Sequence, residues 1–165
     1  MLEVALKYQE MVDRLEGIWI TSSDTEISFD ELLKTISKLD CEIYVGADSN
    51  PSRLPYILAV SIAIIKKNEF AKYFYVRWKP WGNEKPSIRD RLVSEVVTSC
   101  HVASRMKDVM PNRRINVHAD VNPSLKTMSG KYSSELKSMI ESYGFAAKIK
   151  PDSWAASWLA DKLAG

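Results

Sequence analysis

Apolar positions recur with two different periods along the chain, and the changes of period divide it into predicted helices and strands. Residues 2–16 and 29–39 have helical spacing, and a capping box formed by Ser28 and Glu31 begins the second helix. Residues 42–48, 56–65 and 70–78 are rich in β-branched and aromatic residues and are joined by short links. This spacing predicts three antiparallel strands in a meander.

The second half of the chain alternates between helical and strand patterns. Residues 87–110 carry an apolar stripe at helical spacing, and a strand pattern follows at 114–121. A helix is predicted over 130–144, a short strand over 146–150 and a last helix over 153–164. We expect an α/β fold in one domain, with residues 1–40 as an N-terminal helical extension and residues 41–165 as the core.

Composition narrows the class of protein without identifying it. With 45% hydrophobic and 27% charged residues, the chain is typical of a globular protein. No apolar run reaches the length of a membrane span, and the acids among the first residues argue against a signal peptide, so we expect no membrane partner and a cytoplasmic location. Two cysteines, Cys41 and Cys100, are too few for a disulfide framework or a zinc site.

Acidic residues stand at the ends of two predicted strands. Asp48 ends the first strand and alternates onto the face opposite Val45, and Asp120 ends "RINVHAD" in the same way. Glu95 lies beside the apolar stripe of the long helix, and Asp152 precedes the last helix. These four residues are the candidate site.

A cluster of carboxylates needs a counter-charge, because like charges raise one another's pKa. Mg²⁺ and Mn²⁺ prefer oxygen ligands, and two such ions about 3.5 to 4 Å apart can activate water and stabilise the leaving oxygen of a phosphodiester. Each acid also has a structural interpretation: Asp48 and Asp120 precede turn sequences, Glu95 fits an exposed helix position, and Asp152 fits an N-cap.

The sequence resembles the ribonuclease H-like superfamily and, within it, the YkuK-type family of predicted nucleases. The resemblance covers residues 28–165 and is carried by "VGADSN", "RDRLVSEV", "VHADV" and "AKIKPDSWAASWLADK". It implies a mixed five-stranded sheet of order 3-2-1-4-5, with strands 1 to 3 antiparallel and helices flanking the sheet, so that the first strand lies beside the fourth. By the same resemblance, the catalytic metal ligands look like Asp48, Glu95, Asp120 and Asp152. Asp90 competes with Glu95 for the helix position, and Asp161 competes with Asp152.

The segment "RWKPWGNEKPSIRDR", residues 77–91, mixes basic residues with tryptophans. Cations beside exposed aromatic rings suit nucleic-acid backbones and stacked bases, whereas the alternative is an ordinary charged connection whose tryptophans pack in the core. The predicted nucleic-acid contacts are Arg77, Lys79, Trp81, Lys85, Arg89 and Lys150.

We therefore expect a Mg²⁺- or Mn²⁺-dependent nuclease that binds two ions and hydrolyses phosphodiester bonds of DNA or RNA. The alternative is a non-catalytic module of the same fold that binds nucleic acid or a protein. Nothing in the sequence separates DNA from RNA as the partner.

Overall fold

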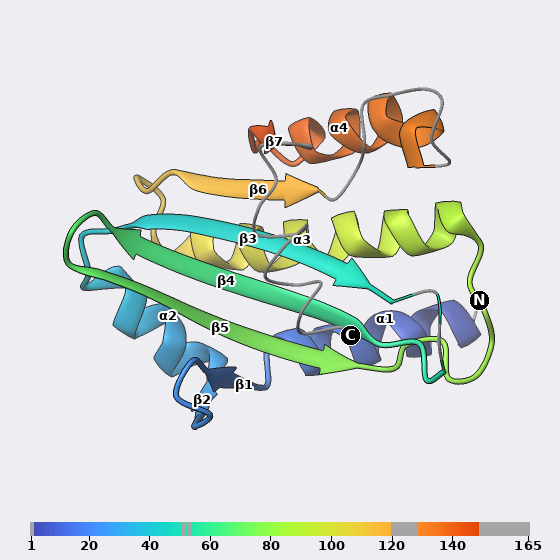
Figure 1. The fold of residues 1–165 in the computed structure, drawn as a ribbon, viewed down its shortest axis with the longest axis horizontal. Coiled ribbons are helices and arrows are strands. Elements are labelled where there is room, and N and C mark those ends of the chain that lie inside the picture. Colours follow the sequence, from blue (N-terminus) through green and yellow to red (C-terminus); the bar gives the residue numbers. More distant parts are fainter. Residues whose placement is uncertain (1, 51, 53, 120–128, 149–165) are drawn as a thin grey trace.

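A seven-stranded mixed sheet forms the centre of the molecule, in the order β2-β1-β5-β4-β3-β6-β7 (Figure 1). The computed structural model describes residues 2–50, 52, 54–119 and 129–148. The strands are β1 (Ile18–Thr21), β2 (Glu26–Ser28), β3 (Glu42–Ser49), β4 (Leu58–Lys66), β5 (Phe70–Trp78), β6 (Ile115–Ala119) and β7 (Ala147–Lys148). The helices are α1 (Leu2–Leu15), α2 (Phe29–Ser37), α3 (Ile88–Val109), the 3₁₀ helix η1 (Ser129–Tyr132) and α4 (Ser133–Ser142).

The five strands predicted for the core are β3, β4, β5, β6 and β7, and the sheet contains them in the predicted relative order. The three strands β3, β4 and β5 are antiparallel neighbours, while β6 pairs parallel to β3 and β7 parallel to β6. The mixed α/β fold class is therefore confirmed. The last predicted helix, over 153–164, lies outside the described residues.

The number of strands was wrong, because the N-terminal extension is not entirely helical. β1 and β2 form a hairpin, and β1 adds this hairpin to the sheet by antiparallel pairing with β5. The hydroxyls of Thr21 and Thr25 lie 2.7 Å apart across the turn, and Asp24 adopts a positive φ there. Strands of four and three residues are too short to show alternation, which explains why this segment resembled a loop in the sequence.

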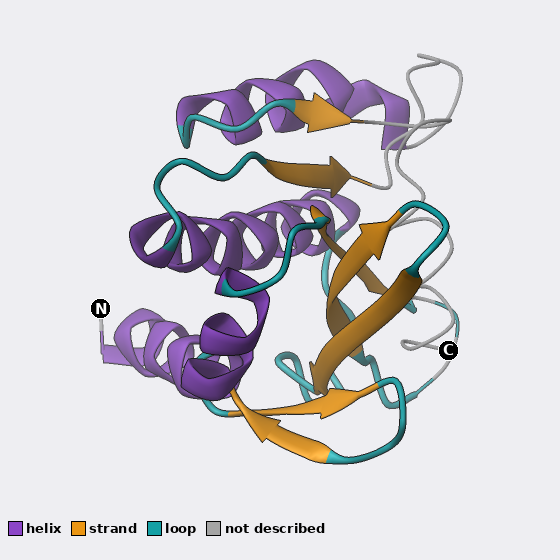
Figure 2. Cartoon of the chain, turned by 90° about the vertical axis from the view of Figure 1, so that its left-hand side faces the viewer, coloured by secondary structure: helices purple, strands orange, loops and turns teal. Residues whose placement is uncertain are grey.

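The two faces of the sheet differ in what packs on them. Figures 1 and 2 show α1, α2 and α3 together on one face, and α4 lies beside β6 and β7 and buries Leu136 and Ile140 in the same core. Alternation points Val45, Ala47 and Ser49 of β3 toward this helical layer, and it points Asp48 toward the opposite face. Consecutive residues at the end of β3 therefore serve different faces.

Helix α3 is positioned by its first turn. The Ser87 side chain caps the helix by accepting a hydrogen bond from the Asp90 backbone N–H at 3.0 Å. The preceding loop connects the end of β5 to this cap, so α3 begins at the end of the sheet where β3 and β5 both finish, on the right in Figure 1. From there it runs beneath β3 and buries Leu92, Val96 and Cys100. Within the described ranges, no helix combines the length and the apolar character needed to cross a bilayer.

Candidate active site

Asp48 lies in the last part of β3 and is only 4% exposed. Its Cα partner on β4 is Ala59, a small residue on the face without α1, α2 and α3. On the other side of β3, the parallel strand β6 ends at Ala119, whose Cα partner is Ala47. Parallel pairing thus brings the carboxyl ends of β3 and β6 to the same edge of the sheet. Asp120 follows Ala119 in the sequence and lies outside the described residues, as does Asp152.

Glu95 reaches the same end of β3 from the helical layer. It lies in the eighth residue position of α3, is 4% exposed, and accepts a hydrogen bond from the Ser49 hydroxyl at 2.6 Å on Oε1. The helix ligand proposed from the sequence therefore faces the sheet, as the apolar stripe around Leu92 and Val96 indicated. The alternative of an ordinary exposed helix glutamate is wrong.

A guanidinium compensates the buried charge of Glu95. Arg91, one helical turn earlier, places Nη1 3.3 Å from Glu95 Oε1, and the same nitrogen lies 3.5 Å from both the carbonyl oxygen and the hydroxyl of Ser49. A buried carboxylate is costly unless it is paired and hydrogen-bonded, and this cluster of Ser49, Arg91 and Glu95 supplies both.

Ser49 and Arg91 were not predicted as site residues. Arg91 stood in the segment interpreted as a nucleic-acid surface, and its i, i+4 spacing to Glu95 is the signal that could have identified the ion pair. For Ser49 the signal is alternation along β3, because the residue after Asp48 must point toward the helix that packs on the other face.

Asp90, the alternative candidate for the metal ligand on the helix, does not face the end of β3. It is exposed and lines a cavity of about 580 Å³ between α1, the loop after β5 and α3, together with Trp81 and Val93. Of the two candidates, Glu95 is the one that contacts the end of β3. Asp161, the competitor for Asp152, lies outside the described residues.

The chemistry of the described donors fits a hard divalent cation. Asp48 and Glu95 offer carboxylate oxygens, the ligand type that Mg²⁺ and Mn²⁺ prefer, from two faces of one strand end. In the part of the chain that the structure describes, no group of three or more His, Cys, Asp or Glu residues is placed to hold a metal ion. Two of the four predicted ligands lie outside that part.

The predicted nucleic-acid contacts are distributed over separate surfaces. Arg77 is exposed on β5, with its guanidinium carbon 6.0 Å from the centre of the Tyr75 ring. Its Cα partner is Ala59, which is in turn the partner of Asp48, so Arg77 and Asp48 lie in one row across the sheet on the same face. This arrangement places a basic side chain two strands from the first predicted ligand.

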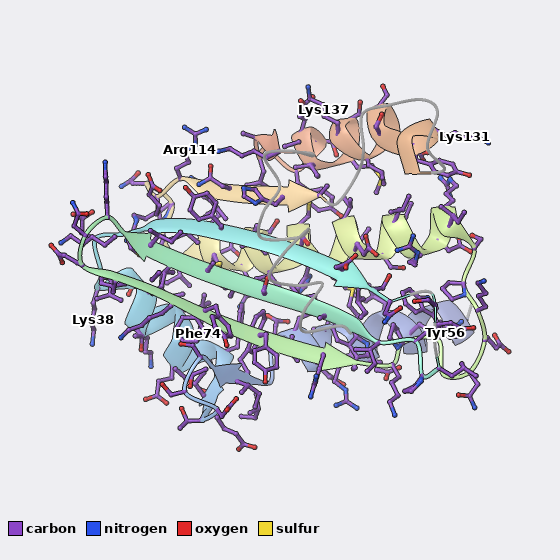
Figure 3. The ribbon with its side chains drawn as sticks, in the orientation of Figure 1. Lys38, Tyr56, Phe74, Arg114, Lys131 and Lys137 are labelled. Atoms are coloured by element: carbon purple, nitrogen blue, oxygen red, sulfur yellow. The ribbon has the colours of Figure 1, made fainter. Side chains whose placement is uncertain are left out.

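The other contacts lie on the helical side or along its edge. Trp81 and Lys85 line the cavity of about 580 Å³, and Lys79 is exposed. Arg89 donates to Glu135 of α4 at 2.6 Å, so its charge is already paired. Trp78 packs in the core, as the alternative interpretation of this segment expected. Lys150 lies outside the described residues. Figure 3 shows two other basic side chains projecting outward, Lys131 from η1 and Lys137 from α4.

Comparison with known proteins identifies the class. The family model described as Ribonuclease H-like matches residues 28–164, which is most of the chain, so the protein belongs to the ribonuclease H-like family. A search of curated proteins and a search of solved structures gave no significant match.

Proposed function

We propose that this protein is a metal-dependent nuclease that hydrolyses phosphodiester bonds of DNA or RNA. The observation that carries the proposal is the pair of buried carboxylates, Asp48 and Glu95, at one end of β3 in a ribonuclease H-like chain. A buried carboxylate is expensive to keep unless it is paired, hydrogen-bonded or bound to a cation. The Glu95 carboxylate pairs with Arg91 at 3.3 Å.

Four acids form the site in this proposal. Asp48 and Glu95 would each supply carboxylate oxygens at the end of β3, from opposite faces, and Asp120 and Asp152 would complete the ligand set from residues adjoining β6 and β7 in the sequence. The cofactor is Mg²⁺ or Mn²⁺, as two ions, which when bound supply Lewis-acid stabilisation of the charge that develops on the phosphate. Ser49 orients Glu95 through the 2.6 Å hydrogen bond, and the burial of both acids limits competing water.

The substrate strand approaches from the face that carries Asp48. Arg77 lies in the same row on that face, and its guanidinium matches the charge and geometry of a backbone phosphate. Within the ribonuclease H-like family, the quoted motifs "VGADSN" and "KIKPDSWAAS" support a YkuK-type protein. A cytoplasmic location and a nucleic-acid partner are parts of the same proposal.

The test is cleavage of end-labelled single strands, duplexes, RNA/DNA hybrids and four-way junctions with Mg²⁺, Mn²⁺ or a chelator. Asp48→Asn keeps the shape of the side chain and removes its charge, so we expect the rate to fall about a thousandfold, since metal stabilisation is worth several kcal/mol and each 1.4 kcal/mol is tenfold. Asp90→Asn is the matched control on an exposed acid of α3 and should cleave normally. Full activity in Asp48→Asn would remove the proposal.

A non-catalytic binding module is the second candidate, and one observation favours it. The Arg91 ion pair already balances the charge of Glu95, as expected for an acid retained for structure alone. This candidate predicts nucleic-acid binding that is unaffected by chelator and by Asp48→Asn. Metal-dependent cleavage that is lost in Asp48→Asn would exclude it.

A further inference from the structure

The contact between Arg91 and Glu95 has a consequence for metal binding. We propose that Arg91 is a positioning residue that acts as the counter-ion of Glu95 in the metal-free protein, and that a divalent cation binds by taking over this role from the guanidinium. The inference rests on the proposed function, because it assigns Glu95 as a ligand. It concerns a residue that neither the motifs nor the family match assigns to the site.

The geometry supports an exchange between the two cations. The Ser49 hydroxyl and the Arg91 guanidinium converge on the same atom, Glu95 Oε1, at 2.6 and 3.3 Å. Backbone pairing between β3 and β4 holds Ser49 in place, whereas the Arg91 side chain is 17% exposed and the Glu95 side chain is 5% exposed. The guanidinium can therefore withdraw toward solvent while Ser49 continues to orient Glu95.

Electrostatics sets the sign of the effect. In the metal-free protein, the positive charge of Arg91 pairs with the buried Glu95 carboxylate and stabilises that form. A divalent ion bound by Glu95 would be repelled by the positive charge of the same guanidinium. The stabilisation of the metal-free form and the repulsion of the ion both lower the affinity of the site for a divalent cation. Removing the charge of Arg91 should therefore strengthen metal binding. If Arg91 served only to hold Glu95 in place, its removal would weaken metal binding instead.

Arg89 provides a matched control on the same helix. It lies two residues before Arg91, its side chain is 54% exposed, and it pairs with Glu135 of α4 rather than with the β3 end. The same substitution at both positions removes one positive charge and one ion pair. The two variants differ in whether the lost charge faces Glu95.

The experiment measures Mn²⁺ binding by the electron paramagnetic resonance signal of free Mn²⁺, with the full chain as wild type, Arg91→Gln, Arg91→Lys and Arg89→Gln. We expect Arg91→Gln to bind Mn²⁺ about tenfold more tightly, since it removes a nearby like charge, and Arg91→Lys and Arg89→Gln to stay within about twofold of wild type. Unchanged or weaker binding by Arg91→Gln would overturn the inference.

A second measurement on the wild-type protein covers the case in which Arg91→Gln does not fold. The ¹⁵Nε signal of Arg91, assigned with Arg91→Lys, should shift on addition of Mg²⁺, while the Arg89 signal should not. An unshifted Arg91 signal at saturating Mg²⁺ contradicts the exchange. Cleavage assays run in parallel separate the two proposals. Metal-dependent cleavage with no effect of Arg91 on Mn²⁺ affinity rejects the inference alone, whereas no metal binding by wild type rejects both.

Discussion

The end of β3 shows how much two adjacent residues can differ. Asp48 and Ser49 follow one another in the chain, yet alternation sends Ser49 toward Glu95 on α3 and Asp48 to the opposite face. The acid that the sequence analysis emphasised and the hydroxyl that it did not emphasise therefore lie on opposite faces of the sheet. We therefore expect substitutions of these two residues to have different effects, on cleavage at Asp48 and on stability at Ser49.

Ser49→Ala tests the stabilising role of the buried hydrogen bond. The variant loses the 2.6 Å contact to Glu95, and a hydrogen bond to a charged group contributes about 1.5 to 3 kcal/mol, so we expect the free energy of unfolding to fall by about that amount. Urea denaturation measures it. Ser52→Ala is the control, because the Ser52 hydroxyl makes a bond of equal length to Asn50 but is exposed. Equal stability of Ser49→Ala and wild type would contradict the importance of this contact.

Cys100 should be a poor nucleophile in the folded protein. Burial raises the pKa of its thiol to about 12, and the thiolate is the reactive form. Burial also raises the pKa of the Cys41 thiol, but Cys41 is partly exposed, so a reagent can reach it more easily than it can reach Cys100. In a Cys41→Ser variant at pH 8, we expect Ellman's reagent to react with Cys100 only as fast as the protein unfolds. Immediate reaction of Cys100 without denaturant would show that the site is open.

Among the elements, α3 matters most, because it carries Arg91 and Glu95 and also contributes to the core. Its start is set by the Ser87 cap at the end of the loop from β5, so the cap determines where Glu95 meets β3. The capping signal and the apolar stripe are local, and the predicted helix at 87–110 accordingly agrees with Ile88–Val109. The β1–β2 hairpin was missed, because its stabilising partner is β5, about fifty residues away.

Substitution of Ser87 tests the cap. Ser87→Ala removes the acceptor for the Asp90 N–H and should lower stability by about 1 kcal/mol, while Ser87→Asp should retain most of it, since Asp is also a strong N-cap residue. Thermal or urea unfolding of the three proteins measures the difference. If the alanine and aspartate variants were equally stable, the cap would not be the cause.

For the whole molecule, the arrangement of strands has consequences for stability at high pH. Burial, followed by the hydrogen bond from its hydroxyl to Glu42, raises the pKa of Tyr44 on β3 to about 12. The unfolded tyrosine loses its proton near pH 10, so between about pH 10 and 12 the unfolded state binds fewer protons than the folded state. The free energy of unfolding therefore falls as pH rises through this window. Below the window, the contribution of Tyr44 to stability does not change with pH.

Tyr44→Phe isolates this effect from the other groups that titrate at high pH. The difference in unfolding free energy between wild type and Tyr44→Phe should be constant below about pH 9.5 and should shrink as pH rises above 10. Urea unfolding at a series of pH values gives this difference directly. A difference that is flat up to pH 11.5 would mean that Tyr44 titrates alike in both states.

The sequence by itself determined the features that depend on near neighbours along the chain. Alternation and helical periodicity located the core strands and α3, and they placed Asp48 near a strand end and Glu95 beside an apolar stripe, because both periods are properties of a few successive residues. The family match to residues 28–164 agrees with that pattern.

Only the tertiary structure decided which groups meet. Ser49 and Glu95 are 46 residues apart, and their contact follows from the packing of α3 on β3. The sequence left the basic segment 77–91 open between a nucleic-acid surface and an ordinary charged connection. In the structure, the end of β5, the loop and α3 direct its side chains toward the Asp48 face, a cavity and α4. Such pairings depend on how elements pack in three dimensions, and local periodicity carries no information about them.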